Sequence, residues 1–570
     1  MLTTRVRNSY DSFRNCSHAS TGVGSPQKLV PALVASALAA SVVRQRFRDV
    51  EPLSVGISEK RNQEQGLRLL YVAFATVTAG LLVYSQTMAF YWDEGFHILT
   101  AYLIDAGKRP YLDFFFPQTP LNAYWNAAWM AIFGPSWRVV HLVAALATVG
   151  SVLLIAQYVF ALFPDRRWRL VAAFAALALF GLHSLAWEFG TISQAYPLCL
   201  LLVVAAFRAA IAAVARPRFE MSVLAGLAAG SAAASTLLTA AVAPVLLVWI
   251  WLHNRAGNRW FKAAGFVSGA AAPSIPVLIL FAHGPHQVVF DILKYHSVYR
   301  RVQWPGASAH DLEVVTDWFN SSPSLLLALL AAMGFYAIKK NGFDDSRYSE
   351  FRLCVWLVLA IGVQNLCAHP TFPQYFVFLI PFLTVLGVIG FHALVARLAN
   401  PDHSQVPLVV LLCLAVLCLG NTLYEDRDSP TWRQLEQVAV KVRQVTRKGA
   451  PLAAPEQLYF LLRWPVPPGM EHDDAHKLKF TPEENARLHI LPEAELDEQI
   501  KGSRFPTAVV CDDDHRVNEL ERWTVYAQTS AIGECTVFWR LTRPPVENRQ
   551  PAPGNPAFAL PEPGLRRGLK

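Results

Sequence analysis

Charged residues are scarce in this sequence. Asp, Glu, Lys and Arg make up 16% of its 570 residues, whereas 53% are hydrophobic, and an ordinary soluble domain has about 25% charged residues. The depletion is concentrated between Leu69 and Gly420. Because a stretch so poor in charge is suited to lipid rather than to water, we predict an integral membrane protein.

Other absences exclude further classes of protein. The Lys and Arg residues form no dense basic stripe, so we expect no nucleic-acid partner. The eight Cys residues show no CxxC or zinc-like spacing, which argues against a structural zinc site. The apolar runs hold almost no carboxylates, although a proton-coupled transporter usually carries them in mid-span. A transporter or flippase of a lipid-linked substrate therefore stays only as the alternative to an enzyme.

Apolar runs of roughly 17–25 residues, the length that crosses the hydrocarbon core of a bilayer, predict about 11 transmembrane helices. Residues 221–253 form a run that is too long for one span and short for two, which we interpret as a broken pair. The predicted spans are Leu69–Phe90, Val139–Phe163, Leu170–Ala186, Ala195–Val214, Ser222–Leu237, Ala240–Leu252, Ala263–Phe281, Ser322–Ile338, Leu353–Cys367, Tyr375–Leu398 and Val406–Gly420.

Basic residues orient these spans, because Lys and Arg concentrate in short loops on the cytoplasmic side. Five basic segments all lie on the same side of the membrane if, and only if, Asn122–Phe133 does not cross it. That segment is short and Trp-rich, as expected for a helix that lies in the membrane interface. The N-terminus is then cytoplasmic, and the loop after the first span faces outward together with the C-terminal tail. We expect the protein in the inner (plasma) membrane of a bacterium, surrounded by membrane lipids.

The pattern divides this α-helical, polytopic chain into four parts. They are a partly disordered cytoplasmic segment, 1–67, a transmembrane domain, 68–420, a small extracytoplasmic α/β domain, 421–545, and a disordered tail, 546–570. In the α/β domain, Cys511 and Cys535 lie in two strand-like segments. Whether they form a disulfide stays open, although the outer compartment would permit it.

An acidic pair, Asp93-Glu94, stands where the first span ends. Two adjacent carboxylates at a membrane surface are costly unless water or a partner charge solvates them. If the pair begins a helix, the two side chains lie about 100° apart and cannot face one point, whereas Asp93 and His97 share a face. We therefore assign catalysis to Asp93, and orientation or ion binding to Glu94. The alternative is that both residues only favour a helix N-terminus.

The first outward loop resembles that of the GT-C glycosyltransferases. It runs from the DE pair and His97, through GKRPYLD and PQTPLNAYW, to Arg138 at the start of the second span. The chain is most similar to the protein O-mannosyltransferase and aminoarabinose-transferase group, which uses polyprenyl-phosphate sugars, over about residues 68–400. The segment His369–Leu383 resembles the polar and aromatic loop before a late span of that group. This chain offers only Glu188 where many relatives have an Asp, and it lacks the protein-binding insert of the eukaryotic mannosyltransferases.

The resemblance implies a GT-C-like fold and a glycosyltransferase that inverts the anomeric carbon in a single displacement. Asp93 would take the proton of an acceptor hydroxyl, with Glu94 in support, while polyprenyl phosphate leaves. The donor is then a polyprenyl-phosphate sugar, and the acceptor is a lipid, a glycan or a protein. A divalent cation, with Glu94 as a ligand, stays open.

The remaining candidate residues come from the outward loops, which we expect to converge on the acidic pair. The leaving phosphate needs positive charge, and its candidate ligands are Lys294, Arg300, Arg301, Arg138 and His369. The candidates for substrate contacts are His97, Glu188, Gln194 and Tyr375.

Overall fold

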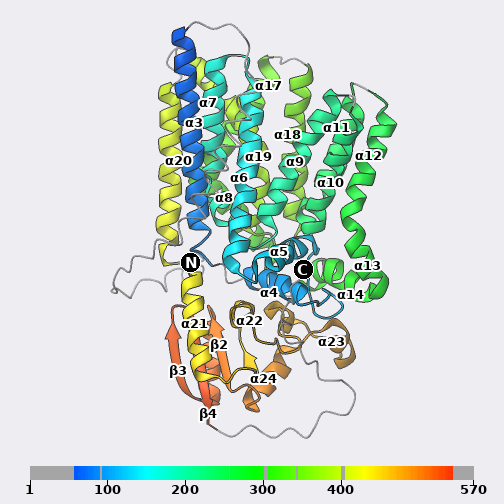
Figure 1. The fold of residues 1–570 in the computed structure, drawn as a ribbon, viewed down its shortest axis with the longest axis vertical. Helices are drawn as coiled ribbons and strands as arrows, with labels where there is room; N and C mark the ends of the chain where they lie inside the picture. The colour runs from blue at the N-terminus through cyan, green and yellow to red at the C-terminus, as the bar shows by residue number, and fades with distance from the viewer. Residues whose placement is uncertain are drawn as a thin grey trace, which may run out of the picture.

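The structure, a computed structural model, is mostly helical (Figure 1). Most of the predicted N-terminal segment, the candidate Arg301 and the predicted tail 546–570 lie outside the residues that the structure describes. The described residues are 57–89, 93–216, 218–255, 257–300, 306–341, 345–398 and 405–542.

Apolar helices form a bundle that makes up most of the molecule (Figure 1). Its elements are α3 (Ile57–Tyr84), α6 (Trp137–Leu162), α7 (Arg166–Ala176), η3 (Leu177–Gly181), α8 (Ser184–Glu188), α9 (Tyr196–Ala215), α10 (Phe219–Ser235), η4 (Leu237–Thr239), α11 (Val242–His253), α12 (Arg259–Ala271), η5 (Ala272–Ser274), α13 (Ile275–His283), α17 (Ser322–Asn341), α18 (Asp345–Cys367), η7 (Pro373–Leu379), α19 (Ile380–Leu398), α20 (Gln405–Glu425) and η9 (Asp426–Asp428).

Eight helical segments of the described chain are long and apolar enough to cross a membrane. They lie in α3, α6, α9, α12–α13, α17, α18, η7–α19 and α20–η9. The shorter apolar helices α10 and α11, and the interrupted run from α7 to α8, occupy the other three predicted spans. An integral membrane bundle is therefore present, and the exact number of crossings stays a prediction.

Small residues allow two of these helices to touch. A Cβ added to Gly226 of α10 would lie 2.0 Å from the Phe266 carbonyl oxygen, and one added to Gly230 would lie 2.2 Å from that of Ala270, both on α12. No side chain larger than hydrogen fits at such distances, so the two glycines set the approach of α10 to α12.

The first predicted span is six residues too long at its C-terminal end. Helix α3 ends at Tyr84 rather than at Phe90, because Ser85–Thr87 turn and Met88 pairs in antiparallel fashion with Thr431. Met88 pairs with a residue more than 300 positions away, so local hydropathy could not predict where α3 ends.

Between the bundle helices, five further elements form: α4 (Glu94–Asp105), α5 (Leu121–Phe133), α14 (Pro285–Val289), η6 (Phe290–Tyr299) and α16 (Ala307–Asn320). Figure 1 shows α4, α5 and α14 at one end of the bundle, next to the C-terminal part of the chain. Helix α5 covers the segment expected at the membrane interface, and it is too short to cross a bilayer.

The C-terminal part, residues 429–542, is named here the sheet domain. Its four strands, β1 (Leu452–Ala453), β2 (Thr507–Cys511), β3 (Tyr526–Ile532) and β4 (Cys535–Leu541), have the order β1-β2-β4-β3. Strands β1 and β2 are parallel and the other pairs antiparallel, and Cys511 and Cys535 face each other in a disulfide. Its helices are α21 (Trp432–Val445), α22 (Glu456–Leu462), η10 (Asp473–Lys477), α23 (Pro482–Leu488), α24 (Glu493–Lys501) and α25 (Asp514–Trp523).

The sheet domain is docked on the end of the bundle that carries α4 (Figure 1). The Trp137 and Trp432 rings stack at 4.9 Å, and Arg138 donates two hydrogen bonds to the Glu436 carboxylate, at 2.6 and 3.1 Å. The backbone of Thr87 also accepts a hydrogen bond from the Trp432 N–H. Both ends of the first outward loop are therefore fixed against α21.

Candidate active site

Glu94, the first residue of α4, is completely buried. Its Oε1 accepts hydrogen bonds from the backbone N–H and the hydroxyl of Ser193, both at 2.9 Å, and it also contacts Nε2 of His141. The other ring nitrogen of His141 lies 2.7 Å from the Ser85 carbonyl oxygen. The carboxylate thus joins α4 to α6 and to the loop before α9, and its oxygen is held by donors of the protein itself.

Asp93 precedes α4 at the N-cap position and is only half-buried. Its side chain accepts no capping hydrogen bond from the helix. Burial raises the pKa of the Asp93 carboxyl to about 6, an effect that the charge of Arg300 opposes and that of Asp474 increases. A carboxylate with this pKa is ionised at neutral pH and is a better proton acceptor than an ordinary aspartate.

Arg300 approaches this region from the end of η6. Its Nη2 donates a hydrogen bond to the Tyr375 hydroxyl at 3.2 Å, and its guanidinium lies over the Phe372 ring at 5.0 Å. The Tyr375 carbonyl oxygen in turn accepts a hydrogen bond from the Asn365 amide at 2.7 Å. The cation is therefore held by one hydroxyl and one ring face, which leaves donors available for an anion.

The sheet domain adds a third side to this group. Asp474 in η10 is close enough to act on Asp93 and on Arg300 through its charge, and Lys477 donates a 2.6 Å hydrogen bond to it. His472 lies two residues before Asp474. Its buried ring stacks on the ring of Phe96 in α4, with the ring centroids 4.4 Å apart. Burial lowers the pKa of His472 to about 4, so its ring is neutral at pH 7.

Two hydrogen bonds fix the loop between α4 and α5 against η6. The Phe116 N–H donates to Oδ2 of the buried Asp291 at 2.9 Å, and Nε2 of His296 lies 2.5 Å from the Pro117 carbonyl oxygen. Because Arg300 ends the same η6 segment, these contacts position Arg300 relative to α4.

The other predicted phosphate ligands have different surroundings. Lys294 is exposed on η6, and Arg138 is paired with Glu436 of the sheet domain. His369 contacts Oδ2 of Asp311, whose Oδ1 accepts a hydrogen bond from the Thr371 N–H at 2.6 Å. Among the candidates that the structure describes, Arg300 is thus the cation that lies within the electrostatic range of Asp93.

The predicted substrate contacts also have different surroundings. Tyr375 is bound to Arg300, and His97 is buried in α4 with its Nδ1 unpartnered among the described residues. Both amide atoms of the buried Gln194 likewise have no described hydrogen-bond partner. Glu188 is affected by the charges of Asp426 and Glu425 rather than by Asp93.

Three residues near the start of α4 were not predicted from the sequence. Asp474 and His472 belong to a His-Asp-Asp-Ala-His segment far along the chain, and Tyr196 opens α9 within reach of the Asp93 charge. The dense run of titratable residues at 472–476 could have indicated a functional site. Its distance of nearly 400 residues from Asp93 concealed the connection.

A metal site is not apparent in this group. No cluster of three or more His, Cys, Asp or Glu side chains in the described part of the chain has a metal-binding arrangement. Glu94, the candidate ligand, is instead engaged by Ser193 and His141.

The fold has a counterpart among solved structures. The structure of ArnT from Cupriavidus metallidurans bound to undecaprenyl phosphate is similar, with a TM-score of 0.57 and 16% identity over 82% of this chain and 97% of that chain. This chain has the GT-C fold. The predicted GT-C resemblance is thereby confirmed at the level of fold, although no protein-family model and no curated protein matches the sequence.

Two oligosaccharyltransferase structures from Archaeoglobus fulgidus are similar to a lesser degree. One is AglB in complex with an inhibitory peptide and a dolichol-phosphate, with a TM-score of 0.45 and 12% identity over 83% of this chain and 74% of that chain. The other, in the apo form, has a TM-score of 0.47 and 13% identity over 78% and 69%. The assignment of the GT-C fold rests on the ArnT structure.

Proposed function

We propose that this protein is a membrane glycosyltransferase that transfers a sugar from a polyprenyl-phosphate donor to a hydroxyl acceptor on the outer face of the membrane. The observation that carries the proposal is the half-buried Asp93, with its raised pKa, within the electrostatic range of Arg300 at the end of a GT-C bundle on which the sheet domain is docked. A base and an anion-binding cation are the two groups that such a transfer requires.

In the proposed step, Asp93 accepts the proton of the acceptor hydroxyl as its oxygen attacks the anomeric carbon. The new carbon–oxygen bond forms on the face opposite the leaving group, and the bond from the anomeric carbon to the phosphate oxygen breaks. Polyprenyl phosphate leaves with the electron pair, and the configuration inverts. General base catalysis of this kind contributes roughly 10²–10⁴-fold to a rate.

Arg300 is the proposed ligand of the donor phosphate. It presents the planar guanidinium that suits a phosphate, and Tyr375 and Phe372 orient it. The ArnT structure contains undecaprenyl phosphate, which supports a polyprenyl phosphate as the lipid part of the donor. Lys294 and Arg301 remain secondary candidates, whereas Arg138 serves to hold the sheet domain.

Glu94 is a positioning residue in this proposal, because its hydrogen bonds fix the start of α4 and with it the backbone of Asp93. The sheet domain closes one side of the site through His472 and Asp474, which makes it the proposed source of acceptor contacts. The transporter alternative is not favoured, because Asp93, Arg300 and Asp474 gather at one end of the bundle rather than at its middle.

The experiment uses the full chain in lipid vesicles with a radiolabelled polyprenyl-phosphate sugar and membranes from a host that lacks the protein as the source of acceptors. The wild type should move label to acceptor and release polyprenyl phosphate, and Asp93→Asn should do neither. Asp105→Asn, an exposed aspartate at the other end of α4, is the matched control and should transfer normally. Movement of intact donor across the vesicle, without transfer, would support the transporter instead.

A further inference from the structure

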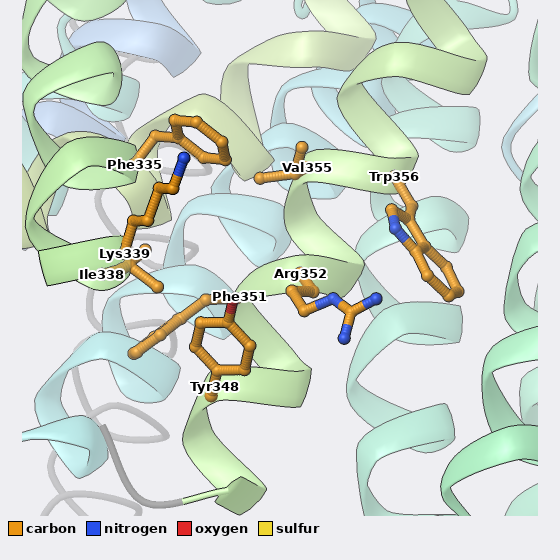
Figure 2. Close-up of a pocket in the computed structure, with 8 residues that line it drawn as sticks. All are labelled: Phe335, Ile338, Lys339, Tyr348, Phe351, Arg352, Val355 and Trp356. Atoms are coloured by element: carbon orange, nitrogen blue, oxygen red, sulfur yellow. The ribbon is translucent and has the colours of Figure 1, made fainter. Parts of the chain in front are cut away.

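A cavity lies between the C-terminal end of α17 and the N-terminal end of α18, at the end of the bundle opposite the sheet domain (Figures 1 and 2). Its volume is about 340 Å³, which is within the range of small-ligand pockets, about 300–1,000 Å³. Figure 2 shows Lys339 of α17 and Arg352 of α18 on opposite sides of the space, with the aromatic rings of Phe335, Tyr348 and Trp356 around them.

Both cations are exposed and lack an acidic partner among the described residues. The Arg352 guanidinium lies over the rings of Tyr348 and Trp356, at 5.8 and 5.6 Å. The nearby acid, Glu350, is already engaged by the Tyr158 hydroxyl at 2.8 Å and by Arg347 at 3.2 Å. Both cations therefore line one space whose described lining contains no carboxylate, and Figure 2 shows the Arg352 guanidinium directed toward Trp356.

The walls of the same cavity are suited to hydrocarbon. Phe335 is 52% exposed on the outer surface of α17, and Ile338 and Val355 add aliphatic surface inside. α17 and α18 are both long and apolar enough to cross a membrane, so we expect lipid beside the exposed Phe335 at this cavity. Basic pockets between transmembrane helices bind the headgroups of anionic lipids.

We propose that this cavity is a binding site for an anionic glycerophospholipid of the membrane leaflet opposite the active site. The lipid headgroup would lie at the rim that Lys339 and Arg352 form, and its acyl chains along Phe335 and Val355. A free phosphate ion shares the charge but would leave the apolar wall exposed, so the lipid is the occupant to which the proposal commits. The site is separate from Asp93 and does not depend on the proposed transfer.

The test is native mass spectrometry of the full chain in detergent, titrated with phosphatidylglycerol or with phosphatidylcholine of the same acyl chains. The wild type should retain phosphatidylglycerol in preference, and Lys339→Gln and Arg352→Gln should each weaken that retention about tenfold, the loss expected for one charge-assisted hydrogen bond. Lys340→Gln, an exposed neighbour that does not line the cavity, is the matched control and should bind like the wild type.

A second measurement leaves Lys339 and Arg352 unchanged. The contribution of Trp356 to the tryptophan fluorescence is the difference between the wild type and Trp356→Phe. In nanodiscs, brominated phosphatidylglycerol should quench this contribution strongly, and brominated phosphatidylcholine should quench it less. Equal retention of both lipids, equal retention by all variants, or equal quenching by both lipids would overturn the proposal. Displacement of phosphatidylglycerol by inorganic phosphate alone would identify a free anion as the occupant and would also overturn it.

Discussion

Asp93 and Glu94 are neighbours in the sequence, yet the first turn of α4 gives them opposite surroundings. Glu94 points into the bundle, is completely buried, and has its oxygen bound by Ser193 and His141. Asp93 is half-buried, accepts no capping hydrogen bond from the helix, and is affected by charges from η6 and from the sheet domain. One carboxylate is used by the fold, and the other is the one that we propose as the catalytic base.

The difference shows how the start of a helix can separate a structural acid from the acid proposed to react. A turn of about 100° per residue sends two adjacent side chains in different directions. The inner one then fixes the helix start, and this fixes the place of the outer one. A reactive carboxylate at a partly open site can be held precisely only because its neighbour is rigid.

The largest effect on stability is expected from Glu94→Ala. Removing one partner of a buried, hydrogen-bonded pair costs about 3–5 kcal/mol, because the remaining polar groups lose their partner away from water. The free energy of unfolding, measured by titration of mixed micelles with a denaturing detergent, should fall by that amount. Asp105→Ala, exposed on the same helix, should change it by less than about 0.5 kcal/mol. Equal losses for the two variants would remove the distinction between an inner and an outer acid.

A smaller effect, and on catalysis rather than stability, is expected from Arg300→Gln. A hydrogen bond to a charged group contributes about 1.5–3 kcal/mol, so kcat/KM for the polyprenyl-phosphate donor should decrease about 10- to 100-fold. The control is Arg109→Gln, since Arg109 is an exposed cation of the first outward loop that pairs with Asp113. If both variants retained the wild-type kcat/KM, Arg300 would not be the phosphate ligand.

The smallest effect concerns pH. Asp93 must be deprotonated to accept a proton, and its pKa is about 6. The rate should therefore be constant above pH 7 and fall below pH 6, to about one-tenth of the plateau at pH 5. Asp474→Asn removes a negative charge that raises this pKa, so the midpoint of the profile should move to lower pH. A midpoint that stays fixed in this variant would show that another group controls the rate.

Much of the helical architecture follows from local patterns. Apolar runs located the bundle helices, and the short, Trp-rich segment forms α5, a helix too short to cross a bilayer. The angle between adjacent helical residues separated Asp93 from Glu94 before any contact was known. These features depend on neighbours in sequence, which is why they could be predicted.

The features that were missed depend on residues far apart in the chain. The end of α3 is set by the pairing of Met88 with Thr431, and Arg138 is occupied by Glu436, 298 residues away. The contribution of Asp474 to the site likewise appears only when the sheet domain is docked on α4. Composition and spacing contain no information on such encounters.

The most direct test of the central claim compares Asp93→Asn with the wild type at a saturating concentration of polyprenyl-phosphate sugar. If Asp93 is the base, kcat should decrease about 10²–10⁴-fold, while the Kd for the donor and the free energy of unfolding stay close to the wild-type values. A variant that keeps the wild-type kcat would contradict the assignment of Asp93 and, with it, the division of roles between the two adjacent acids.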